Sequence, residues 1–156
     1  MKSDDIEKEP LLPTDAAVLS WLENKAEQLH AHARMLVDDY WRQLNQRHQH
    51  VTTKERGRIG LRIRRRESRL SFSIEWYRMA TLRQNGQNKP ICQYLKKGPG
   101  YRYPLQRILK GEPDWEQQLV ETLENEFADI RKQMAMLGKL RDAYLQFQKA
   151  METGLR

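Results

Sequence analysis

Three arginines stand at every second position near the middle of the chain, at Arg62, Arg64 and Arg66. They alternate with Leu61 and Ile63. In an extended strand, therefore, the three guanidinium groups share one face and the apolar side chains share the other. A guanidinium group donates two parallel hydrogen bonds to a phosphate, and it pairs in the same way with the edge of guanine. This spacing predicts a surface that binds a polyanion such as nucleic acid.

The distribution of charge supports this interpretation. The net charge is +7 over 156 residues, but the segment from Lys54 to Lys110 holds 16 Lys and Arg against three acids. That segment carries +13 and the remainder carries −6. A plainer interpretation is an edge strand kept from aggregating by its charge. We favour nucleic acid because the bias extends over the whole segment, and a local excess of one sign indicates a partner of the other.

Further cations are expected to contact the sugar-phosphate backbone beside this surface. Lys96 and Lys97 precede a Gly-Pro-Gly loop, and Arg102 lies between Tyr101 and Tyr103. These tyrosine rings can either stack on bases or pack the loop onto the sheet. The predicted DNA-binding residues are Arg62, Arg64 and Arg66, supported by Arg58, Arg69, Lys96, Lys97 and Arg102.

The residue types that perform covalent or metal chemistry lack the spacing it needs. The histidines form two pairs, His30 with His32 and His48 with His50. Residues two apart on a helix point roughly 200° apart, whereas helical metal ligands are three or four apart. Cys92 has no second cysteine for a disulfide or a zinc knuckle. No nucleophile, base and orienting group come together. We expect a non-catalytic protein without a metal or cofactor.

Two long amphipathic helices are predicted on either side of the basic segment. The first, residues 15–49, follows Thr14, a residue type common at helix N-caps. The second, residues 113–153, begins with Pro113, which the first helical turn tolerates. Apolar residues three and four apart form one stripe on each helix. The stripes are Leu22, Ala26, Leu29, Ala33, Leu36 and Tyr40 on the first and Val120, Leu123, Phe127, Ile130, Met134 and Leu137 on the second. The acids of the second helix are interpreted as part of a solvated face, and the four tryptophans as core residues.

Between these helices the hydrophobic period changes to two, which predicts strands. Asn85-Gly86 is a strong hairpin signal, because both residues tolerate positive φ. The returning strand, about Lys89 to Lys96, is expected at a sheet edge because Pro90 cannot donate a ladder hydrogen bond. We therefore predict an α+β fold: a three-stranded antiparallel meander over residues 57–97, a loop over 98–112, and a long helix on each side. Residues 13–156 are expected to form one domain.

The first twelve residues are acidic and are expected to be a disordered tail. They contain no apolar signal core, and no apolar run in the chain approaches the ~20 residues that a membrane span needs. We expect a cytoplasmic protein that does not enter a membrane.

Several segments of the basic region and of the second helix together resemble the MobI family, the auxiliary mobilisation proteins of conjugative plasmids and integrative conjugative elements. The resemblance rests on Gly57–Arg62, Phe72–Tyr77, Lys97–Tyr101, Trp115-Glu116 and Phe127–Arg131. It implies a factor that recognises the origin of transfer on double-stranded DNA and helps a relaxase, with other relaxosome proteins, to begin transfer. The chain lacks the histidine triad and catalytic tyrosine arrangement of the relaxase itself. The family brings no assigned site residues, so those above rest on charge and spacing.

Other functions stay open from the sequence. A transcriptional regulator or an RNA-binding module would carry a similar basic surface. A protein-interaction adaptor would use its helices for one partner and its basic face for an acidic one. Because site-specific DNA recognition commonly uses a dimer on paired half-sites, we expect the long helices to serve a homodimer.

Overall fold

The computed structural model describes residues 14–65 and 70–154, so the N-terminal tail and two predicted contact residues, Arg66 and Arg69, lie outside it. The main elements are α1 (Asp15–His50), β1 (Ile59–Arg65), β2 (Phe72–Gln84), β3 (Gln87–Tyr94) and α3 (Asp114–Gly154). A 3-10 turn (Thr53–Glu55) and the short helix α2 (Leu105–Ile108) lie in the connections. The predicted α+β order of helix, three antiparallel strands and helix is confirmed.

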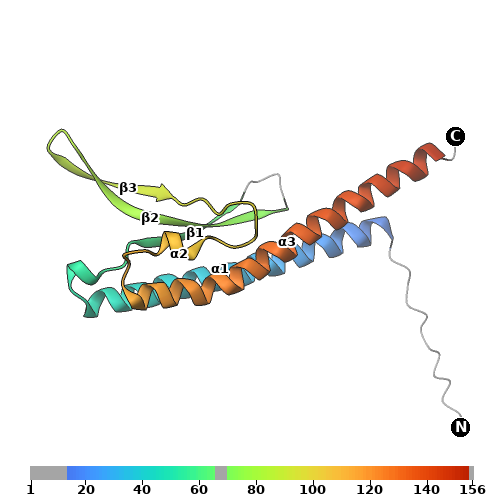
Figure 1. Ribbon diagram of the computed structural model, residues 1–156. Helices are drawn as coiled ribbons and strands as arrows, with labels where there is room; N and C mark the ends of the chain where they lie inside the picture. Colours follow the sequence, from blue (N-terminus) through green and yellow to red (C-terminus); the bar gives the residue numbers. More distant parts are fainter. Residues whose placement is uncertain (1–13, 66–69, 155–156) are drawn as a thin grey trace, which may run out of the picture.

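The two long helices lie side by side in antiparallel directions, and the sheet lies along one side of the pair (Figure 1). Thr14 caps α1, because its hydroxyl accepts a hydrogen bond from the amide of Ala17. At the same end of the pair, the Tyr144 hydroxyl donates to Asp15, and α3 continues past the start of α1. The predicted apolar stripes supply most of the buried residues of both helices.

Trp76 of β2 lies at the centre of the core and is fully buried. Its ring meets Tyr40 of α1 and Phe127 of α3 edge to face, with centroids 5.2 and 5.8 Å away. The Tyr40 hydroxyl also donates to the carbonyl oxygen of Ile59 at 2.5 Å, which ties α1 to β1. The inner face of the sheet therefore packs on both helices at once. The prediction that Trp21 is a core residue is wrong, because about half of its side chain is exposed on the helix surface.

The sheet has the order β1-β2-β3, so β2 is central and β3 forms an edge, as Pro90 predicts. Asn85 (φ 51°) and Gly86 (φ 74°) form the two-residue turn between β2 and β3, which confirms the hairpin. The strand begins at Gln87 rather than near Lys89, because this tight turn lets Gln87 pair directly with Gln84.

Two acids of α3 are buried, which corrects the interpretation of its acids as a solvated face. Glu124 is fully buried and accepts hydrogen bonds from the indole of Trp76 (3.1 Å) and the amide of Tyr103 (2.8 Å). Arg131, about two turns further along α3, forms an ion pair with it at 2.7 Å and also donates to the carbonyl of Ile74 at 3.1 Å. The carboxylate is buried because donors from the sheet, the loop and its own helix converge on it.

Glu116 is the second buried acid. One carboxyl oxygen accepts from the amide of Ile59 at 2.7 Å, and the other has no hydrogen-bond partner in the described part of the chain. Burial raises the pKa of Glu116 to about 7, and the nearby Glu112 adds to this effect. At pH values below this pKa the carboxyl group is mostly neutral, which avoids a buried negative charge with a single hydrogen-bond partner.

Replacing Glu124 by alanine should strongly destabilise the fold, because it leaves the largely buried Arg131 guanidinium without its counter-ion and the donors of Trp76 and Tyr103 without an acceptor. We expect a loss of about 3–5 kcal/mol in the free energy of unfolding. Urea denaturation followed by circular dichroism measures this loss as a lower midpoint at unchanged slope. Glu121→Ala, at an exposed position of the same helix, is the control. Equal midpoints for the two variants would contradict the role given to Glu124.

Glu116→Gln should make stability less sensitive to pH. The folded-state pKa of Glu116, about 7, exceeds its ordinary value of 4.5, so its stabilising effect is complete below pH 4.5 and is lost as pH rises through 7. Glutamine mimics the neutral acid at every pH. The advantage of the variant over the natural chain should therefore grow by about 1–3 kcal/mol between roughly pH 5 and pH 8. Urea denaturation across this range tests it, and parallel stability curves would refute it.

Candidate nucleic-acid interface

The outer face of the sheet lies opposite the helices, and β1 places its alternate arginines there. Arg62 pairs across the sheet with Glu75, and Arg64 pairs with Ser73. Leu61 precedes Arg62, faces the core and is buried, and Ile63, between the two arginines, packs against the same core. The alternation in the sequence therefore corresponds to two faces of one strand.

Arg62 is held by its neighbours on this face. Its Nη2 and Nε atoms lie 2.8 and 3.2 Å from the Glu75 carboxylate, and its guanidinium carbon lies 3.9 Å from the centroid of the Tyr94 ring. The Glu75 carboxylate raises the pKa of Arg62, because it stabilises the charged form. Arg62 thus joins all three strands, and a phosphate would have to compete with Glu75 for it.

Arg64 and Arg65 point to opposite sides, as the period of two requires. Arg65 reaches across to α1 and forms an ion pair with Glu27. Arg64 is exposed, and within the described ranges no ion pair or side-chain hydrogen bond involves it. Of Arg62 and Arg64, the two predicted contact arginines of β1 that the structure describes, Arg64 is therefore the one that presents an uncompensated charge.

Arg58 lies just before β1 and is less available. Its Nη2 lies 3.6 Å from the buried carboxylate of Glu112, although its own side chain is 62% exposed. Arg78 of β2 approaches the same carboxylate at 3.6 Å and donates to the carbonyl of Ile108 at 2.6 Å. Both arginines help to hold the connection before α3 against the sheet.

The cations in and beside the loop after β3 have different contacts. Lys97 donates to the carbonyl oxygens of Gly98 and Gly100, so it closes its own loop. Lys96 and Arg102 are exposed, and in the part of the chain that the structure describes their side chains form no hydrogen bond or ion pair.

The two tyrosines of this loop also differ. Tyr103 is buried beneath the Arg131 guanidinium, 4.9 Å from its ring centroid, and packs the loop onto α3. Tyr101 is 40% exposed. Tyr101 is therefore exposed enough to stack on a base, whereas Tyr103 packs the loop onto the protein.

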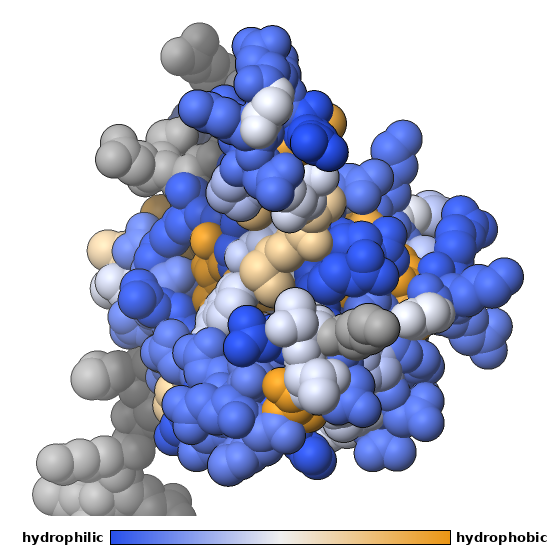
Figure 2. Space-filling view, turned by 90° about the vertical axis from the view of Figure 1, so that its left-hand side faces the viewer, coloured by the Kyte–Doolittle hydropathy of each residue, from blue (hydrophilic) through white to orange (hydrophobic). Residues whose placement is uncertain are grey.

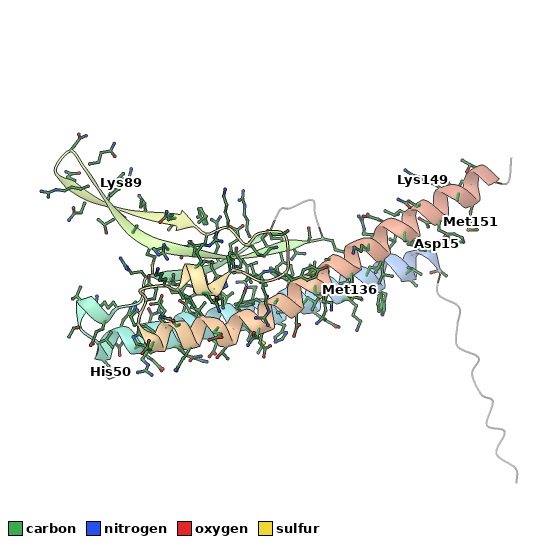
Figure 3. The ribbon with its side chains drawn as sticks, in the orientation of Figure 1. Asp15, His50, Lys89, Met136, Lys149 and Met151 are labelled. Carbon is green, nitrogen blue, oxygen red and sulfur yellow. The ribbon has the colours of Figure 1, made fainter. Side chains whose placement is uncertain are left out.

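A basic ribbon that the sequence prediction did not single out extends from this face. The outer halves of β2 and β3 curve away from the helices, and Lys89 stands near their far end (Figures 1 and 3). All residues from 81 to 94 are exposed. One sequence signal could have found the ribbon: no Asp or Glu occurs from residue 76 to 111, a stretch that holds eight Lys and Arg.

Figure 2 views the molecule from the side toward which this ribbon points, and most of that surface is hydrophilic with small hydrophobic areas. In the described residues, no three or more His, Cys, Asp or Glu side chains are grouped so that they could hold a metal ion. None of the described helices is long and apolar enough to span a membrane.

A family model described as MobI protein matches residues 29–145. The chain belongs to the MobI family. The match runs from within α1 through the whole sheet and most of α3, so it contains every predicted contact residue. MobI membership makes this a mobilisation-associated protein. No curated protein and no solved structure matches the chain significantly.

Proposed function

We propose that this MobI-family chain is a non-catalytic auxiliary factor of conjugative transfer that binds double-stranded DNA. It recognises the origin of transfer there and assists the relaxase, within the relaxosome, in initiating mobilisation. One observation carries the proposal: Arg64, Lys96 and Arg102 are exposed cations without a protein counter-charge among the described residues, in a region almost devoid of acids. The phosphates of DNA supply the missing charge.

The geometry of the sheet supports a shared surface for two of these cations. The amide of Leu95 donates to the carbonyl of Trp76 at 3.2 Å, so the pairing of β2 with β3 continues one residue beyond Tyr94. By the strand period of two, Lys96 then emerges on the same side as Tyr94. Tyr94 lies under Arg62. Lys96 therefore belongs with the outer-face arginines of β1, and the backbone of DNA is the ligand that such a row fits.

The proposal includes a homodimer, so that two such surfaces meet two half-sites. The competing functions predict different ligands. An RNA-binding module would prefer RNA to duplex DNA, a regulator would bind promoter DNA rather than the origin of transfer, and an adaptor would bind neither with salt-dependent affinity.

Replacing Arg64, Lys96 and Arg102 together by alanine should weaken DNA binding and its salt dependence. Each lost phosphate contact lowers the log–log salt slope by about 0.9, so the slope should fall by roughly two to three. Fluorescence anisotropy with a duplex containing the origin of transfer of the chain's own mobile element, titrated at several NaCl concentrations, measures both quantities.

The control is Lys132→Ala, Lys139→Ala and Lys149→Ala, three exposed cations on α3 that carry the same total charge. It should leave the slope unchanged. Equal slopes for the two triple variants would remove the proposed contact surface, and equal affinity for random duplexes would remove recognition of the origin.

Glu75→Gln should strengthen DNA binding, because it releases the Arg62 guanidinium from its carboxylate partner at 2.8 Å. The salt slope should rise by about one if Arg62 then contacts a phosphate. Glu121→Gln on α3 changes the net charge equally and is the matched control for the same anisotropy titration. A gain no larger than that of the control would place Arg62 outside the interface.

A further inference from the structure

The end of the β2–β3 ribbon, residues 83–89, has a composition that the turn itself does not explain. It reads Arg-Gln-Asn-Gly-Gln-Asn-Lys, with two cations, four carboxamides, no acid and no apolar side chain. The tight turn requires only Asn85 and Gly86, whose φ angles are 51° and 74°. The turn does not require the residue types of Gln84, Gln87 and Asn88. In the described chain, no side-chain hydrogen bond or ion pair connects residues 83–89 to the rest of the protein.

These side chains are the ones that distinguish base pairs in the major groove. A carboxamide pairs with N6 and N7 of adenine, and arginine pairs with O6 and N7 of guanine. Contacts to phosphate need only positive charge, which the ribbon would supply as well with lysines. A tip rich in both glutamine and asparagine therefore suits base edges better than it suits the backbone.

The dimensions of the ribbon fit the same site. Two paired strands lie about 4.8 Å apart, and the major groove is about 12 Å wide and about 8.5 Å deep. Pairing is continuous from Met79 opposite Cys92 to Gln84 opposite Gln87. The five steps from Met79 to Gln84 extend about 17 Å, so the tip reaches the floor of the groove while the base of the ribbon stays outside.

The base of the ribbon is braced by the outer face of the sheet. The rings of Tyr77 and Tyr94 meet edge to face with centroids 6.0 Å apart, and Arg62 lies over Tyr94 and pairs with Glu75. This bracing explains why Arg62 is bound within the protein rather than free. A ribbon formed before binding loses less conformational entropy when it enters a groove.

We infer that residues 83–89 are the base-reading element of this protein, which enters the major groove of double-stranded DNA and contacts base edges through Arg83, Gln84, Gln87 and Asn88. The inference rests on the proposed DNA-binding function. Two regions then have different roles. Residues 83–89 select the DNA sequence, and Arg64, Lys96 and Arg102 bind the DNA backbone.

Selection from a pool of random 20-base-pair duplexes tests the inference with the full chain. The natural chain should enrich a defined motif. The variant Gln84→Ala, Gln87→Ala and Asn88→Ala keeps the turn residues, and it should keep the affinity for random duplex and the salt slope. Its preference for the motif over random duplex should fall by roughly 10- to 100-fold, as expected when bidentate base contacts are lost.

The matched control is Asn45→Ala, Gln46→Ala and Gln49→Ala, which removes the same exposed carboxamides from α1. It should enrich the natural motif. Replacing the purines of that motif by 7-deaza analogues, which lack N7 in the major groove, should weaken the natural chain at least about tenfold. The tip variant keeps only Arg83 of the four base contacts, so it should be weakened less.

The outcomes separate this inference from the proposed function. Failure of the natural chain to bind any duplex at low salt overturns both. Binding without an enriched motif overturns the base-reading tip and leaves backbone binding in place. Enrichment of the same motif by the tip variant also overturns the base-reading tip. If that variant loses relaxase binding instead, the tip contacts a protein partner. Insensitivity to 7-deaza purines overturns the major-groove placement.

Discussion

The carboxylate of Glu124 is the contact on which the arrangement of this protein depends. It lies fully buried on α3 and accepts hydrogen bonds from the indole of Trp76 in β2 and the amide of Tyr103 in the following loop. Arg131 neutralises it from the same helix. One buried charge thus joins the helix pair, the central strand and the basic loop. Such a charge is tolerated only while every partner is present, so it ties these three parts to one relative position.

The Glu124 contact also determines the position of the outer face of the sheet. Once Trp76 is seated between the helices, its neighbours Glu75 and Tyr77 must point outward by the strand period of two. Glu75 then orients Arg62, and Tyr77 meets Tyr94 of β3. A core interaction on one side of β2 therefore organises a charged and aromatic surface on the other. The β2–β3 ribbon extends from this surface, and β2 therefore also determines where the ribbon begins.

Charge is distributed unevenly over this frame. The helices carry most of the acids, and the segment from Lys54 to Lys110 carries 16 of the 28 Lys and Arg. Some of these cations are used internally, as Lys97 closes its loop and Arg65 reaches Glu27. Others are left exposed. A surface with both kinds combines a rigid support with exposed cations, and the proposed binding of duplex DNA would use both properties.

The sequence by itself determined the element order, the two faces of β1 and the position of the hairpin. These follow from local rules: the change of hydrophobic period from 3.6 to 2, and the positive φ that Asn85-Gly86 accepts. Only the tertiary structure decided which arginine is compensated and which acids are buried. Arg62 and Arg64 look alike in the sequence, but one stands opposite Glu75 and the other opposite Ser73. Glu116 and Glu124 look like surface acids until donors from distant segments meet them. Periodicity assigns a side chain to a face, whereas its partner depends on which remote residue the fold brings opposite to it.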